Sequence, residues 1–128
     1  MEELIVADTD IIIDFFTDAP PFAQAVSKLI KENKLAITSV SVFELYAGIT
    51  GKKRLKQIED FVKNIYVYPL NLIEAAIAGK IFTELKANGS LIGNQDILIA
   101  GICIANSLTL LTRNVTHFEI IKDLKLIS

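Results

Sequence analysis

The sequence predicts an α/β fold, a three-layer α/β/α domain with helices on both faces of a mostly parallel, four- to five-stranded sheet. Short apolar runs rich in β-branched residues alternate with longer amphipathic segments along the whole chain, a pattern typical of parallel strands joined by helices. No repeat, linker or low-complexity tract divides the chain, so we expect residues 1–128 to form one domain.

The first three predicted elements occupy the N-terminal quarter of the chain. Leu4–Ala7 is a short apolar run and predicts a buried strand. A helix is expected over Ile11–Phe16, with Thr9 or Asp10 as its N-cap. The Pro-Pro pair then opens a second helix, which extends over about Pro20–Asn33 with one apolar face.

The next segment predicts a strand followed by two helices. Leu35–Thr38 has the composition of a second strand. Ser41 and Glu44 match a capping box, which predicts the start of a helix that ends near Gly48. The amphipathic spacing over Lys53–Asn64 predicts another helix.

The C-terminal half continues the alternation. Ile65–Tyr68 predicts a third strand, and Leu72–Asn88 predicts a long helix that a glycine ends. A further helix is expected from Gly93 to about Asn106. Leu108–Thr112 predicts a fourth strand, and Lys125–Ile127 a short last one.

Three acids from distant parts of the chain follow or precede these strands at the same predicted edge. Asp8 comes directly after the first strand, Glu44 lies in the helix after the second, and Asp96 lies in the helix before the fourth. Functional sites of open parallel sheets form beyond the carboxyl ends of the strands. Each acid alone is explained by helix capping or by the helix dipole, but their coincidence predicts a shared site with Thr112 and Asn114 at its edge.

A cluster of carboxylates is typical of a site for a divalent metal ion. Acids held together repel each other, and a Mg²⁺ or Mn²⁺ ion relieves that repulsion through the hard oxygen ligands it prefers. Such an ion activates water and stabilises charge on a phosphate. We therefore expect Asp8, Glu44 and Asp96 to be both metal ligands and catalytic acids.

Four segments in order resemble the motifs of PIN-domain ribonucleases, in particular the VapC toxins of toxin–antitoxin pairs. Together they cover nearly the whole chain: Ile5–Asp14, Thr38–Gly48, Ile92–Ala100, and Leu110–Asn114 followed by Phe118. The resemblance implies a homodimeric endoribonuclease with one or two Mg²⁺ or Mn²⁺ ions, an RNA substrate and a VapB-like antitoxin partner. It assigns the metal-binding and catalytic roles to Asp8, Glu44 and Asp96, and a supporting hydroxyl to Thr112.

The sequence departs from the family pattern at the fourth acid. Where many relatives carry an acid after the threonine or before the phenylalanine, this chain has Asn114 and His117. Three acids suffice for one ion, with Asn114 reaching it through a water. The departure leaves the number of metal ions open.

Two other functions fit parts of the sequence. Asp8 and Asp10 after a hydrophobic strand also resemble the opening of haloacid-dehalogenase-like phosphatases, in which a nucleophile and a general acid stand two residues apart. That alternative expects a late pair of adjacent acids, which the chain lacks, and leaves Glu44 and Asp96 unexplained. The missing fourth acid instead favours a catalytically weak PIN-fold binding module.

Composition and charge further limit the kinds of protein and partner that the sequence is compatible with. The formal net charge of −2 argues against binding nucleic acid through overall charge, although Lys52, Lys53 and Arg54 form a local basic cluster that could guide RNA. A single cysteine, Cys103, lies among isoleucines and predicts a buried thiol in a reducing cytoplasm. No apolar stretch is long enough to span a bilayer, and the high apolar content predicts a homodimer.

Overall fold

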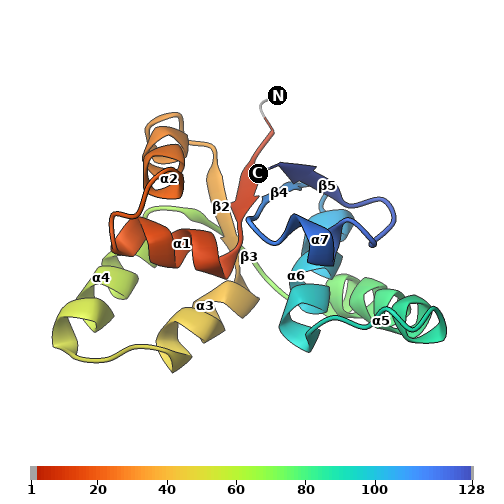
Figure 1. The fold of residues 1–128 in the computed structure, drawn as a ribbon. Helices are drawn as coiled ribbons and strands as arrows, with labels where there is room; N and C mark the ends of the chain where they lie inside the picture. Colours follow the sequence, from red (N-terminus) through yellow and green to blue (C-terminus); the bar gives the residue numbers. More distant parts are fainter. Residues whose placement is uncertain (1–2, 128) are drawn as a thin grey trace.

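The fold is a five-stranded, wholly parallel sheet with helices on both faces (Figure 1). It was obtained as a computed structural model, which describes residues 3–127. In chain order its elements are β1 (Ile5–Ala7), α1 (Thr9–Phe16), α2 (Phe22–Lys31), β2 (Leu35–Thr38), α3 (Ser39–Ala47), α4 (Lys52–Val62), β3 (Tyr66–Tyr68), α5 (Leu72–Ala87), α6 (Asn94–Ala105), β4 (Thr109–Leu111), α7 (Val115–Phe118) and β5 (Lys125–Ile127). The predicted fold class is confirmed.

The strands lie in the order β3-β2-β1-β4-β5. The chain therefore builds outward from β1 in one direction through β2 and β3, and later returns to the other side of β1 with β4 and β5. The strand order reverses between β1 and β4, and in parallel sheets ligands bind at such a switch point. The hydrogen bond from the Asp8 amide to the Leu111 carbonyl, at 2.9 Å, extends the pairing of these strands to their carboxyl ends.

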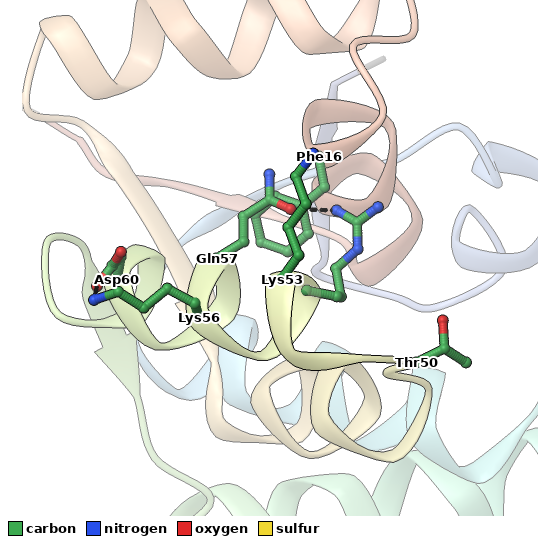
Figure 2. A pocket seen from close by; sticks show the side chains of 7 residues that line it. Phe16, Thr50, Lys53, Lys56, Gln57 and Asp60 are labelled. Atoms are coloured by element: carbon green, nitrogen blue, oxygen red, sulfur yellow. Dashed lines mark hydrogen bonds and ion pairs between the residues drawn. The ribbon is translucent and has the colours of Figure 1, made fainter.

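One face of the sheet packs against α1, α2 and α4. Alternate strand residues such as Ala7, Ile37 and Leu111 point to this side, because side chains of a strand alternate between faces. They form a core with buried side chains from these helices, including Ile58 of α4. Phe16 at the end of α1 lies over α4 at the rim of this layer (Figure 2).

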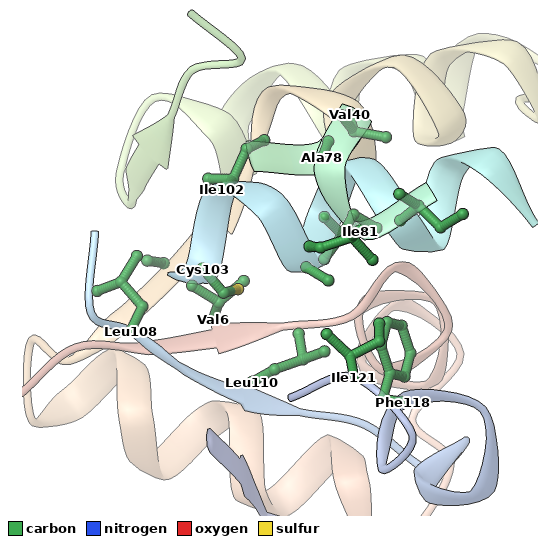
Figure 3. Close-up of a cluster of buried hydrophobic side chains, with 14 of the residues drawn as sticks. Val6, Val40, Ala78, Ile81, Ile102, Cys103, Leu108, Leu110, Phe118 and Ile121 are labelled. Carbon is green, nitrogen blue, oxygen red and sulfur yellow. The ribbon is translucent and has the colours of Figure 1, made fainter. Parts of the chain in front are cut away.

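The other face packs against α5 and α6. Val6 and Leu110 lie on this side, and Phe118 of α7 closes the end of the cluster (Figure 3). Cys103 is completely buried here, as predicted, and burial raises the pKa of its thiol to about 12. At Gly101 the two helices approach so closely that a Cβ atom would lie 2.8 Å from the Cβ of Ala78.

All of the predicted helices and strands are present, but the predicted starts of several of them were wrong. The cap of α1 is Asp8, whose side chain accepts from the Thr9 amide, so neither Thr9 nor Asp10 caps the helix. The capping box at Ser41 was also wrong: α3 begins at Ser39, and the Thr38 hydroxyl accepts from the Ser41 amide at 3.1 Å. Several hydroxyl and carboxylate side chains lie close together near the start of each helix, and any of them could cap it. The residue at which the preceding strand ends determines which one does.

The short helix α7 was not predicted, because four residues carry too little periodicity to be recognised. Within residues 3–127, no helix is both long and apolar enough to cross a membrane.

Candidate active site

Asp8 lies at the end of β1 and is the most buried acid of the described residues, with 4% of its surface exposed. Its two carboxylate oxygens are held separately. The backbone amide of Thr9 donates to Oδ1 at 2.8 Å, and the hydroxyl of Thr112 donates to Oδ2 at 2.9 Å. Asp8 is thus fixed between the first turn of α1 and the end of β4, the two elements that flank the switch point.

Burial is the main cause that raises the pKa of Asp8, to about 6. The hydrogen bonds from Thr112 and Thr9 favour the charged form and lower the pKa in part, whereas the negative charges of Asp96 and Asp10 raise it further. Asp8, Asp96 and Asp10 are therefore close enough to interact electrostatically. Within the described chain, no lysine, arginine or histidine forms an ion pair with Asp8.

Glu44 reaches the same edge from α3 and is connected to Asp8 through Thr9. Its Oε1 accepts a hydrogen bond of 2.7 Å from the Thr9 hydroxyl. The same hydroxyl oxygen lies 2.8 Å from that of Ser41. Because Thr9 gives its proton to Glu44, Ser41 is the donor in this second bond. Buried hydroxyls thus orient Glu44 toward the first turn of α1.

Asp96 lies in the first turn of α6, opposite His117 of α7. Its Oδ2 is 3.8 Å from Nδ1 of His117, whose side chain is 59% exposed. Burial raises the pKa of Asp96, the nearby His117 lowers it when charged, and Asp10 raises it. His117 thus occupies a position where the family resemblance expects an acid, and it forms an ion pair with Asp96 only when it is protonated.

Arg113 ties the loop after β4 to α1. Its Nη1 donates to Oδ2 of Asp14 at 2.8 Å, and its Nη2 lies 4.0 Å from Oδ2 of Asp10. Asp14 is itself buried, and its carboxylate is bound to Arg113.

The two expected supporting residues act in different ways. Thr112 is completely buried and donates directly to Asp8. Asn114 contacts the network through its backbone, since its amide donates to the Thr112 hydroxyl at 3.0 Å. This bond orients Thr112, so that its proton points to Asp8.

The three predicted acids therefore lie at one edge, but in two connected parts. Asp8 and Asp96 interact through their charges, while Glu44 is linked to them through Thr9. Among residues 3–127, no group of three histidine, cysteine or acidic side chains is close enough together to hold a metal ion. The metal set remains a prediction.

A family model for the PIN domain matches residues 5–122, which is nearly the whole chain and contains every residue of this site. The chain belongs to the PIN domain family. Its similarity to VapC proteins, expected from the four motifs, is confirmed by two curated relatives. Ribonuclease VapC2 of Rickettsia felis is 31% identical over 127 residues, covering 94% of both chains, and ribonuclease VapC1 of Haemophilus influenzae is 31% identical with 95% of both covered.

A solved structure gives the same result for the PIN fold. The chain superposes on VapBC2 from Rickettsia felis, solved bound to a DNA fragment from their promoter, with a TM-score of 0.85 and 28% identity over 97% of both chains. A second similar structure is VapBC-1 from nontypeable Haemophilus influenzae, with a TM-score of 0.79 and 25% identity. None of these findings supports the haloacid-dehalogenase alternative.

Sequence reasoning missed the hydroxyl network and the Arg113 ion pairs of this PIN domain. The bonds from Thr9 to Glu44 and from Arg113 to Asp14 join residues 35 and 99 positions apart. The sequence offers only one local signal for these contacts, which is that Thr9 directly follows Asp8 and Arg113 directly follows Thr112. This adjacency does not indicate that Thr9 bonds to Glu44 or that Arg113 bonds to Asp14.

Proposed function

We propose that this PIN domain is a metal-dependent endoribonuclease and the toxin of a toxin–antitoxin pair. The observation that carries the proposal is Asp8, a buried carboxylate at the switch point of the sheet that faces further negative charge and has no cationic partner among the described residues. The names of the similar proteins, ribonuclease VapC1 and VapC2, support the reaction.

The residues present fit a hard divalent cation, Mg²⁺ or Mn²⁺. Each carboxylate oxygen of Asp8 accepts only one hydrogen bond, and a carboxylate oxygen has a second lone pair to offer. Mg²⁺ keeps several waters and uses one or two carboxylates. Asp8 and Asp96 would hold the ion directly, and the half-buried Glu44 would bind one of its waters. When bound, the ion supplies an activated water and offsets phosphate charge.

The other residues of the site position these groups. Thr112 and Thr9 hold the two oxygens of Asp8, so its carboxylate keeps one orientation while water and substrate exchange. Glu44, fixed by Thr9, is the group we assign to take the proton of the attacking water. Arg113 is 46% exposed and places a positive charge at the rim, where a phosphate would enter.

We further propose a VapB-like protein as the partner of this chain. The similar solved structures are VapBC complexes, and a toxin of this kind requires an inhibitor that covers its site. In a growth assay, expression of the chain alone should arrest growth, whereas co-expression of the proposed VapB-like partner should restore it. Normal growth of cells that contain the folded chain alone would count against a toxin.

An exposed apolar surface supports the proposed homodimer. Phe43 of α3 is 62% exposed, and Leu72 and Ile73 at the start of α5 are 85% and 67% exposed. Leu70 and Leu98 line a hollow beside Phe43. Large apolar side chains exposed in this way are typical of an interface. Sedimentation should give a dimer at micromolar concentration, and Leu72→Asp should shift it to a monomer. A monomeric wild-type protein would contradict this part of the proposal.

The central test is cleavage of a mixed RNA pool with and without Mn²⁺. Wild-type protein should cleave only with the ion, and Asp96→Asn should lose at least roughly 100-fold in rate, on the order of the effect of removing a metal-binding charge. Asp123→Asn is the matched control, because this exposed loop acid has a backbone conformation that asparagine also adopts. Absent cleavage by the folded wild type would refute the nuclease and leave the PIN-fold binding module as the explanation. Cleavage that does not require the ion would refute the metal-dependent mechanism.

A further inference from the structure

The first half of α4 carries four positive charges, Lys52, Lys53, Arg54 and Lys56, outside the acid site. Lys56 is paired with Asp60 on its own helix, at 3.1 Å. No ion pair within residues 3–127 involves any of the other three cations. The whole protein has a net charge of −2. A local cluster of positive charges without ion-pair partners therefore indicates a surface that binds an anion.

Arg54 is held in one orientation by two neighbours. Its guanidinium lies over the ring of Phe16, 5.4 Å from the centroid, and its Nη1 donates to Oε1 of Gln57. These contacts come from two helices and fix a half-buried guanidinium at the wall of a hollow. An arginine oriented in advance binds phosphate with less loss of entropy.

Lys53, Arg54 and Lys56 line a hollow of about 530 Å³ between α4 and Phe16 (Figure 2). A second, narrower hollow of about 140 Å³ shares Phe16, Thr50 and Arg54 with the first and extends to Glu44. The two hollows are therefore adjacent, with lysines at the far end of the first and a predicted catalytic acid at the far end of the second.

The walls of the second hollow are mostly apolar. Ile13, Leu45, Ile49 and Ile58 line it together with Phe16. Surfaces that bind single-stranded nucleic acid combine cations for the backbone with apolar and aromatic side chains for the unstacked bases. A duplex hides its bases and would not use such walls, and a peptide of acidic residues alone would contact only the cations.

We propose that Lys53 and Arg54, with Phe16 beside them, bind the phosphate backbone of single-stranded RNA and lead it along these hollows to Glu44. The inference rests on the proposed ribonuclease function and deepens it. The acids at the catalytic edge repel RNA, so a strand needs attractive contacts at a distance from them. The basic half of α4 is placed to supply these contacts.

The test is binding of a fluorescein-labelled, mixed-sequence RNA of about 12 nucleotides by fluorescence anisotropy, in EDTA so that no cleavage occurs. The variant is Lys53→Gln with Arg54→Gln. The matched control is Lys80→Gln with Lys86→Gln, which removes the same charge from exposed positions of α5 on the opposite face of the sheet. Circular dichroism verifies folding, and Lys53→Gln alone replaces the double variant if that one is unfolded.

We expect the Lys53/Arg54 variant to bind RNA roughly tenfold more weakly at low salt, and the slope of log Kd against log salt to fall by about 1.4, since each single-strand phosphate contact contributes about 0.7. The control should match wild type. If the wild type cleaves RNA but the Lys53/Arg54 variant shows unchanged affinity and slope, the proposed RNA groove is refuted and the ribonuclease function is not. No RNA binding or cleavage by wild type would overturn both.

A labelled octaglutamate peptide distinguishes the protein rival. Loss of peptide binding in the Lys53/Arg54 variant with intact RNA binding would assign the groove to an acidic segment of a protein partner and refute our proposal. Loss of RNA binding with no measurable peptide binding by wild type would support it.

Discussion

Replacing Asp8 by asparagine should stabilise the metal-free protein at alkaline pH, although it removes a proposed catalytic group. Asp8 is 4% exposed, and its pKa is raised from the ordinary 3.8 to about 6. Raising a carboxyl pKa by one corresponds to a free energy of about 1.4 kcal/mol, so the ionised carboxylate costs the folded state about 3 kcal/mol. Asparagine has nearly the same shape and no charge.

The pH range of this effect follows from the two pKa values. Below pH 3.8 the carboxyl is protonated in both the folded and the unfolded chain, and the charge penalty is absent. Between pH 3.8 and 6 the unfolded chain ionises first, so the stability of wild type falls as the pH rises. Above pH 6 the full penalty remains. The Asp8→Asn variant should lack this fall.

One cost opposes the gain. The hydroxyl of Thr112 donates to Oδ2 of Asp8 and accepts from the Asn114 amide. An amide nitrogen in place of Oδ2 cannot accept the Thr112 proton, which costs about 1 kcal/mol at every pH. We therefore expect Asp8→Asn to be about 0.5 kcal/mol less stable than wild type near pH 4, where part of the charge penalty is already present, and about 2 kcal/mol more stable at about pH 8.

The assay is urea unfolding followed by circular dichroism in EDTA, from about pH 4 to about pH 8. Asp123→Asn, which changes an exposed acid, serves as the control and should follow wild type throughout. Stability curves that run parallel for wild type and Asp8→Asn across this range would refute the reasoning, because they would show that burial of Asp8 carries no charge penalty.

Three further predictions concern the metal, the helix pair and the acids. Millimolar Mn²⁺ should raise the melting temperature of wild type, and Asp8→Asn should lose most of that gain; no shift in wild type would count heavily against a metal site. Gly101→Ala should destabilise the fold by about 2 kcal/mol in thermal unfolding, since its Cβ would lie 2.8 Å from the Ala78 Cβ and 2.9 Å from the Glu74 backbone oxygen, both in α5. Gly79→Ala, with nothing within 4 Å, should gain up to about 1 kcal/mol, and equal effects of the two would disprove the packing argument. In metal-dependent RNA cleavage, Asp96→Asn should be crippled while Asp10→Asn, 46% exposed at the rim, stays within about threefold of wild type; a dead Asp10→Asn beside an active Asp96→Asn would reverse the assignment.

Much of the fold could be predicted because it depends on patterns that are local in the chain. The run Leu35–Thr38 is buried throughout, as expected for a central strand covered on both faces. The amphipathic spacing in the segment of α4 identified its buried Ile58 and Phe61. Short elements carry less pattern, and for that reason α7 was missed and the caps of α1 and α3 were assigned to neighbouring residues.

The sequence by itself determined that Asp8, Glu44, Asp96 and Thr112 meet at one edge. Parallel strands all end on the same side, whatever the strand order. Residues that directly follow a strand lie at that edge, and so do residues such as Asp96 that begin the helix leading back to the start of the next strand. The family resemblance used the same information, since its motifs follow these strand ends.

Only the tertiary structure decided how these residues are connected. Whether Thr9 donates to Glu44, Arg113 binds Asp14 or Asp96 faces His117 depends on the strand order and on helix positions to within an ångström. A hydrogen bond weakens steeply over such a distance, whereas hydrophobic patterning tolerates it. The burial that raises the pKa of Asp8 has the same origin, because it depends on the packing of the distant end of β4 against β1 and the start of α1.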